Sequence, residues 1–140
     1  MIRTAALVFV RDCALLLVRP AGKTAFYMPG GKIEHHESPL TALNREVREE
    51  LGSVAVPPIT HLCDIIAQAY GEPQGVLVRM ACFTASLESP PRPCAEIAEI
   101  GWFTAADYRL QPDRAPAVEE LFKHPALLST IKTGRLGEIE

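Results

Sequence analysis

The sequence of 140 residues has little charge and no excess of positive charge. Charged residues make up 22% of it, hydrophobic residues make up 48%, and the formal net charge is -3. Disordered chains combine low hydrophobicity with high net charge, so this balance indicates a globular protein. Because acidic residues outnumber basic ones, we expect no broad basic face for a nucleic-acid polymer. Phosphate groups of a ligand must then be bound by a metal ion or by a few individual Lys or Arg side chains at the site.

A long hydrophobic run is also missing. The apolar N-terminal stretch, residues 1–10, contains Arg3 and ends at Arg11-Asp12, which is too soon for a membrane-spanning helix. It also lacks the small-residue cleavage pattern of a secretory signal. The sequence therefore predicts a cytoplasmic protein that does not associate with a membrane.

The four cysteines include no Cys-x-x-Cys pair, and the four histidines have no metal-ligand spacing apart from one adjacent pair. This argues against a zinc site. Cys13, Cys63 and Cys82 lie in or beside apolar runs, where cysteine commonly serves as a small core residue. We expect all three to be structural.

The order of apolar runs and breaks predicts one α/β domain, residues 1–140, with a mixed sheet and helices packed on it. The first strand is expected in the interior of the sheet. A tight polar turn is expected to join it to the second strand, which lies next to it. Pro57-Pro58 is expected to precede the third strand. Strands are expected at 2–10, 14–18, 61–70, 76–87 and 97–103, and helices at 39–51 and 116–131, the second kinked or split at Pro125.

The first helix has clear end signals. Ser38 can accept from the free N-terminal amides, Pro39 suits the first helical position, and Gly52 suits the C-terminal stop. One apolar stripe at helical spacing is assigned to the core: Leu40, Leu43, Val47 and Leu51.

The same helix carries three carboxylates close together. At the helical repeat, Glu49 and Glu50 lie about 60° and about 40° to either side of Glu46, so all three share one face. Like charges so close repel each other unless a cation lies between them, and oxygen ligands favour Mg²⁺ or Mn²⁺. The alternative is a solvated face on which Arg45 pairs with Glu49 four residues on.

The loop before the helix favours the metal interpretation. Residues 31–52 resemble the Nudix box. The matching pattern is Gly31, then five residues, Glu37, then seven residues, the run Arg45-Glu46-Val47-Arg48-Glu49-Glu50, then one residue and Gly52. Two positions depart from that pattern. Ser53 stands where the box ends in an aliphatic residue, and His36 stands where many members have glycine.

The resemblance implies an α/β/α sandwich and a divalent metal bound by Glu46, Glu49 and Glu50, with the Gly30 carbonyl as a further oxygen ligand. Glu37 and Arg45 would hold the loop against the helix. Gly31 and Gly52 belong to the same scaffold. The general base would be a box glutamate, Glu50, or a glutamate from a later loop, Glu96. Glu49 would contribute to catalysis through the metal.

The implied reaction is metal-dependent hydrolysis of a diphosphate linkage in a nucleoside triphosphate or another nucleoside diphosphate-linked small molecule. Arg19 and Lys32 are candidates for binding its phosphates, and each can equally be a solvated cation. Phe26 and Tyr27 can stack on a base, although aromatics in such a strand are more often core. The alternatives are a nucleotide-sensing or interaction domain on the same fold and an isomerase of isoprenoid diphosphates. A homodimer is the common default for a small enzyme.

Overall fold

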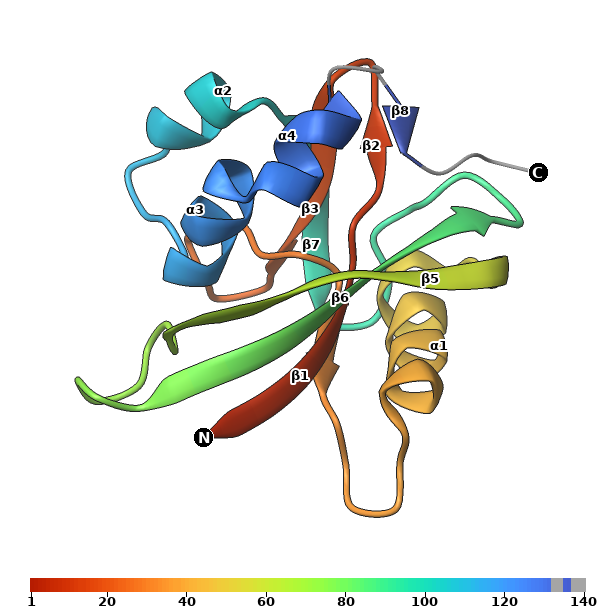
Figure 1. Cartoon of the computed structure of the whole chain (residues 1–140), viewed down its shortest axis with the longest axis horizontal. Helices are drawn as coiled ribbons and strands as arrows, with labels where there is room; N and C mark the ends of the chain where they lie inside the picture. The colour runs from red at the N-terminus through yellow and green to blue at the C-terminus, as the bar shows by residue number, and fades with distance from the viewer. Residues whose placement is uncertain (132–134, 137–140) are drawn as a thin grey trace.

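The computed structural model describes residues 1–131 and 135–136, which form two four-stranded sheets with helices on either side (Figure 1). The helices are α1 Pro39–Leu51, α2 Ala105–Arg109, α3 Pro116–Lys123 and α4 Pro125–Ile131. The strands are β1 Ile2–Leu7, β2 Val10–Arg11, β3 Ala14–Pro20, β4 Gly30–Lys32, β5 Ala55–Gln68, β6 Leu77–Leu87, β7 Ile97–Phe103 and β8 Arg135–Leu136.

The first sheet has the strand order β4-β1-β6-β5 and is mixed, because β1 and β6 run parallel while the other pairs are antiparallel. The second sheet, β7-β3-β2-β8, is antiparallel. These pairings confirm the mixed α/β fold and the interior position of the first strand. One expectation is wrong, because the apolar run at 2–10 is not one strand beside the second. It breaks after Leu7, and Val10 continues in the other sheet opposite Leu15.

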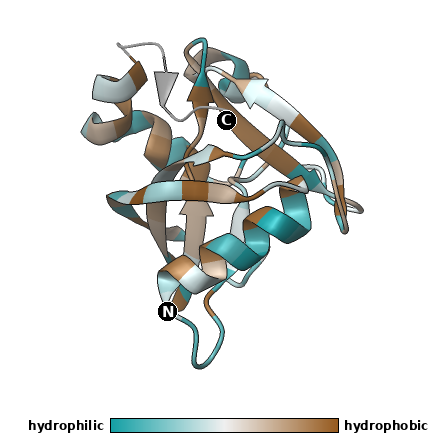
Figure 2. Cartoon of the chain, turned by 90° about the vertical axis from the view of Figure 1, so that its right-hand side faces the viewer, coloured by the Kyte–Doolittle hydropathy of each residue, from teal (hydrophilic) through white to brown (hydrophobic). Residues whose placement is uncertain are grey.

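Residues 5–10 are buried on both faces of the chain, which explains why this part of the N-terminal run is apolar at every position. Residues with odd numbers, such as Ala5, Leu7 and Phe9, pack in the core under α1, and even-numbered ones pack in the core that includes residues of α3 and α4. In Figure 2, α1 shows hydrophilic residues toward the viewer, and the strands behind it are hydrophobic. A run that is apolar at every position gives no sign of where its hydrogen-bonding partner changes.

Helix α1 begins and ends as expected. The Ser38 side chain accepts from the Thr41 amide, and Gly52 adopts the left-handed conformation at φ 61° while its N–H donates to the Arg48 carbonyl. Leu40, however, is 41% exposed, so its assignment to the core is wrong. It shares the angular position of the buried Leu51 but lies in the first turn, near the loop.

Strand β5 and helix α2 differ from expectation. Strand β5 begins at Ala55 and passes through the cis Pro57–Pro58 bond, with a shift in register against β6 between Val56 and Thr60. The prolines interrupt the ladder because they lack an N–H, but the chain stays extended. Helix α2 was not expected from the sequence, although its capping box of Thr104 and Asp107 is a local signal. The predicted split at Pro125 is confirmed.

Cys63 and Cys82 are buried core residues, as expected, but Cys13 is exposed. It occupies a left-handed position, φ 64°, in the turn between β2 and β3. A residue at such a turn lies outside both sheets, which explains why the apolar neighbours were misleading.

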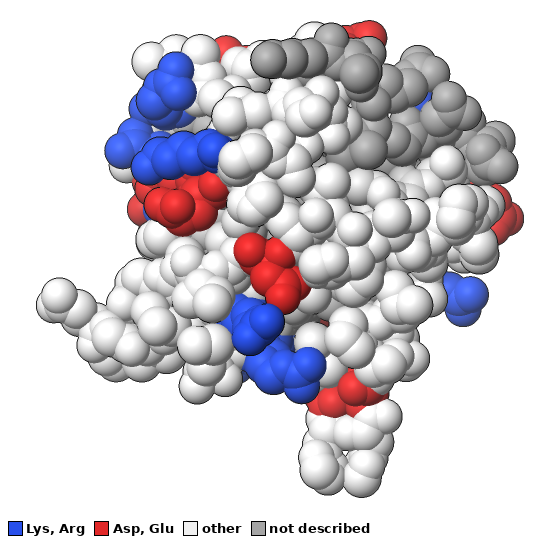
Figure 3. Space-filling view, in the orientation of Figure 1, with Lys and Arg blue, Asp and Glu red and all other residues white. Residues whose placement is uncertain are grey.

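The charged side chains on the face seen in Figure 3 form small groups of both signs, and its described part shows no broad basic area. Among the described residues, no helix is long and apolar enough to cross a membrane.

Candidate active site

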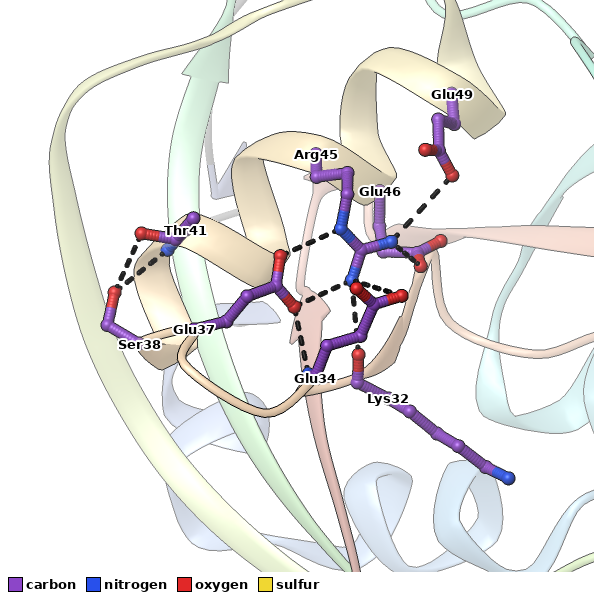
Figure 4. Close-up of polar contacts among 8 residues, drawn as sticks. All are labelled: Lys32, Glu34, Glu37, Ser38, Thr41, Arg45, Glu46 and Glu49. Carbon is purple, nitrogen blue, oxygen red and sulfur yellow. Dashed lines mark hydrogen bonds and ion pairs between the residues drawn. The ribbon is translucent and has the colours of Figure 1, made fainter.

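Arg45 links the loop before α1 to the acidic face of the helix (Figure 4). Its guanidinium donates twice to Glu37, from Nε to Oε2 and from one terminal nitrogen to Oε1, both at 2.8 Å. It also donates to Glu46 Oε1 at 2.7 Å and to the Lys32 carbonyl at 3.2 Å. These bonds from Arg45, and then the Glu34 amide, lower the pKa of Glu37 to about 2. The loop is therefore held against the helix by charge-assisted hydrogen bonds.

Two glycines let this loop approach closely. Gly30 has φ 148°, and a side chain there would meet the Ala5 carbonyl oxygen at 2.1 Å. A side chain at Gly31 would meet the Glu46 carboxylate at 2.6 Å. The double glycine is needed because β1 lies against one of its residues and a carboxylate lies against the other.

The carboxylates of the acidic face differ in exposure. The side chains of Glu46 and Glu49 are 12% and 50% exposed, and Glu50 is buried at 6%. Oxygens of Glu46, Glu50 and Glu96 lie within 4.8 Å of one another, and we call these three residues the carboxylate cluster. Glu49 lies outside the cluster, with one oxygen 3.8 Å from an Arg45 nitrogen.

Burial changes the protonation of two residues of the cluster, Glu50 and Glu46. The pKa of Glu50 is raised to about 8, mainly by burial and further by the charges of Glu46, Glu96 and Glu49. The Gly30 N–H, which donates to Glu50 Oε1 at 2.8 Å, opposes that shift. Burial likewise raises the pKa of Glu46 despite its bond from Arg45. The folded chain thus holds acidic groups where their charges are unfavourable without a cation.

Glu96 reaches the cluster because the segment before β7 packs on the C-terminal end of α1. The amide of Arg92 donates to the Leu51 carbonyl and that of Cys94 to the Glu50 carbonyl, both at 3.0 Å. These bonds satisfy carbonyls that the helix leaves without partners. Ala95 then turns the chain with φ 51°, immediately before Glu96.

A cavity of about 310 Å³ adjoins the cluster. It lies between strands β1 and β6 and the start of α3, and Glu50 and the Gly30-Gly31-Lys32 strand form part of its lining. Apolar residues provide most of the remaining lining, with Tyr27, Tyr70 and Lys23 among the others. A mostly apolar cavity with a few polar groups is the usual form of a small-molecule site.

Residues 1–124 match the family model described as the NUDIX domain. The chain belongs to the NUDIX family. It is a Nudix hydrolase, one of the pyrophosphohydrolases that act on phosphoanhydride bonds. No curated protein sequence matches this hydrolase.

Three solved structures resemble this Nudix hydrolase. The E. coli ORF135 protein is 27% identical, with 92% of this chain and 89% of that chain covered and a TM-score of 0.70. A MutT NUDIX hydrolase from Burkholderia pseudomallei is 24% identical, with 91% and 95% covered and a TM-score of 0.68. The NUDIX domain of Shewanella oneidensis NrtR, complexed with ADP ribose, is 23% identical, with 88% and 84% covered and a TM-score of 0.64.

The two predicted phosphate-binding cations of the Nudix hydrolase lie in different surroundings. Lys32 lines the cavity, and its side chain extends away from Arg45 in Figure 4. Arg19 instead donates to Glu99 at 2.9 Å and to the Lys23 carbonyl at 3.0 Å. Lys23 lines the cavity but was not singled out from the sequence, because a lysine in a loop has no distinguishing local signal.

Both departures from the Nudix box have local explanations. His36 adopts φ 76°, the left-handed conformation that glycine takes most easily. Ser53 is buried, and its hydroxyl donates to the Ser89 carbonyl at 2.8 Å and accepts from the Ser89 amide at 3.0 Å. Where the box has an aliphatic residue, this chain uses a hydroxyl to hold the segment that leads to Glu96.

Proposed function

We propose that this Nudix hydrolase cleaves a diphosphate linkage in a nucleoside triphosphate or another nucleoside diphosphate-linked small molecule, and that it requires Mg²⁺ or Mn²⁺. The observation that carries the proposal is the carboxylate cluster, whose oxygens lie within 4.8 Å of one another. Glu50 belongs both to this cluster and to the lining of the cavity. A metal held there would therefore lie beside a bound substrate.

The residues present fit a hard divalent cation. The donors are carboxylate oxygens, and burial raises the pKa values of Glu46 and Glu50, so a nearby cation would stabilise their ionised forms. Glu49, half exposed on the same helix, and the Gly30 carbonyl complete the proposed ligand set. Mg²⁺ typically takes few protein ligands and shares its other positions with water and phosphate.

When bound, the cation would neutralise phosphate oxygens and make a coordinated water more acidic. The chain supplies the other requirements. Arg45 holds Glu46, and the Gly30 amide holds Glu50, so both carboxylates are oriented before substrate binds. Lys23 and Lys32 provide cations for phosphate charge at the cavity. Glu50 and Glu96 are the two carboxylates we propose for accepting the proton of the attacking water.

The bound ADP ribose in the NrtR domain supports a nucleotide-type ligand, because that molecule contains a diphosphate between two ribose groups. It does not distinguish hydrolysis from binding. The intact Glu46, Glu49 and Glu50 favour hydrolysis over the sensor alternative, since a domain that only binds has no need of all three.

The test is a hydrolysis panel of nucleoside triphosphates, ADP-ribose and nucleotide sugars, assayed by phosphate release after treatment with pyrophosphatase or phosphatase. We expect activity with Mg²⁺ or Mn²⁺ and its complete loss with chelator. Glu50→Gln and Glu96→Gln should each reduce kcat, whereas Arg48→Gln, on the far side of α1, should not. Full activity in metal-free protein would overturn the mechanism, and ligand binding with no hydrolysis would favour the sensor.

A further inference from the structure

A second cavity lies on the other face of the first sheet. Its volume is about 460 Å³, larger than that of the cavity beside the carboxylate cluster. Ile2 of β1 and Val78 of β6 line the first cavity. The next residues of these strands, Arg3 and Arg79, line the second. Because side chains alternate between the two faces of a strand, the two cavities are on opposite sides of the sheet. The apolar part of the second lining includes Ile33, Pro39, Ala81 and Phe83.

Two arginines lie directly opposite each other in the second cavity. Arg3 of β1 is the register partner of Arg79 of β6, and both residues are exposed. In Figure 3 a small basic group lies over β1 and β6. Like charges at opposite positions of paired strands destabilise a sheet. Within residues 1–131 and 135–136, the Arg3 guanidinium has no ion pair and no hydrogen bond, so nothing there offsets its charge directly.

The charge of Arg79 is compensated by a carboxylate that it shares with a histidine. One guanidinium nitrogen of Arg79 lies 3.0 Å from Asp64 Oδ2, and His61 Nε2 lies 2.7 Å from Asp64 Oδ1. The hydrogen bond with His61, and then that from Arg79, lowers the pKa of Asp64, so this carboxylate is ionised at neutral pH. Asp64 and His61 both line the cavity. Two guanidinium groups thus face one carboxylate whose oxygens already have partners, and the cavity keeps an excess of positive charge.

We propose that the second cavity binds a small molecule that carries a phosphate monoester, with Arg3 and Arg79 as the groups that bind the phosphate. Such an ester carries about two negative charges at neutral pH, which suits two cations better than the single charge of a carboxylate. Arginine also binds phosphate through paired N–H groups. The organic part of the ligand would contact Phe83 and Ala81. The proposal does not rest on the proposed function, because it involves neither the carboxylate cluster nor the first cavity.

The alternative is that the two arginines are only solvated cations on an exposed sheet face. In that case phosphate esters would not bind between them, and replacing Arg3 would leave the response of the protein to an ester unchanged. A ligand that binds the folded chain stabilises it. If the cavity is a binding site, an ester should raise the midpoint of thermal unfolding of the wild-type protein, and Arg3→Gln should remove most of that rise.

The experiment titrates metal-free, ¹⁵N-labelled protein with phenyl phosphate and with benzoate, and it follows the Nε–H resonances of Arg3 and Arg79 by NMR. We expect phenyl phosphate to shift both resonances and to bind more tightly than benzoate, which has the same ring but a single charge. Arg3→Gln and Arg79→Gln should each raise the Kd of phenyl phosphate about tenfold, the scale of losing a hydrogen bond to a charged group. Arg48→Gln is the matched control, because this exposed arginine of α1 lies outside the cavity, and its Kd should equal that of the wild type.

Lys32→Gln separates the two cavities, because Lys32 lines only the first. If this variant weakened phenyl phosphate while Arg3→Gln did not, the ester would bind in the first cavity and the proposal would be overturned. Equal affinities for phenyl phosphate and benzoate, or no shift at either arginine, would also overturn it. Arg3→Gln stays informative if Arg79→Gln fails to fold, since the Arg3 side chain has no partner among the described residues. Binding here without any hydrolysis of nucleotides would support this proposal and refute only the proposed enzymatic function.

Discussion

Replacing Glu50 by glutamine should make the metal-free protein more stable and the enzyme almost inactive. Glu50 is 6% exposed, and its pKa is raised from the ordinary 4.5 to about 8 by burial and by neighbouring carboxylates. Below about pH 4.5 the carboxyl is protonated in both folded and unfolded chains, so it costs nothing. As the pH rises toward 8, the unfolded chain loses this proton while the folded chain keeps it, and stability falls.

The size of the effect follows from the two pKa values. At 1.36 kcal/mol per pKa unit, the linked loss of stability is about 3 kcal/mol at pH 7 and about 1 kcal/mol at pH 5. Glutamine has no charge to lose and can still accept from the Gly30 amide. Glu50→Gln should therefore exceed the wild type by about 3 kcal/mol at pH 7 and by about 1 kcal/mol at pH 5. Its kcat should fall at least about a hundredfold.

The assay is urea unfolding in chelator at both pH values, together with turnover in Mg²⁺. Glu49→Gln is the matched control, since it makes the same chemical change on the same helical face at a side chain that is 50% exposed. It should also lower kcat at least about a hundredfold through metal binding but change stability little. A stability difference for Glu50→Gln that did not shrink between pH 7 and pH 5 would refute the electrostatic reasoning. Full turnover in this variant would show that the carboxylate is structural.

Three further predictions concern the scaffold. Arg45→Lys should lower turnover at least about tenfold with the fold intact by circular dichroism, because lysine cannot make the paired bonds to Glu37, and wild-type turnover would contradict this. Because the pKa of Glu37 is lowered to about 2, its pairing with Arg45 stabilises the protein above about pH 4.5, and this stabilisation is lost as the pH falls toward 2. Glu37→Gln should therefore reduce the fall in the free energy of unfolding between about pH 4.5 and about pH 2, as measured by urea titrations. A fall as steep as that of the wild type would argue against the pairing. Cys63→Ala and Cys82→Ala should each lower the free energy of unfolding by about 1 kcal/mol without changing kcat, and Cys13→Ser should change neither, whereas selective loss of turnover would reveal a catalytic thiol.

The sequence alone was sufficient for the helix and loop at residues 30–52. Its signals act over one or two helical turns: a cap at Ser38, a left-handed stop at Gly52, and carboxylates at a spacing that puts them on one face. The pairing of Arg45 with Glu37 was also predicted, because the family pattern relates positions that are near in the chain. Local geometry determines these features almost regardless of the rest of the molecule.

Tertiary structure decided how the acidic residues differ. Helical spacing puts Glu49 and Glu50 on the same face, but only packing against β4 and the segment before β7 buries Glu50 and leaves Glu49 half exposed. The same packing brings Glu96 into the cluster. Its candidacy came from the family pattern, since no local signal links it to α1.

Long-range contacts also determined three other features: the break of the first apolar run between two sheets, the presence of Lys23 in the cavity lining, and the hydrogen bond from the Tyr70 hydroxyl to Asp113. Hydrophobic patterning says which residues are buried, but it does not say which strand or loop lies opposite them. Those partners are determined when distant segments pack together. In this protein such packing forms the cavity, whereas most of the proposed metal ligands lie within one loop and one helix.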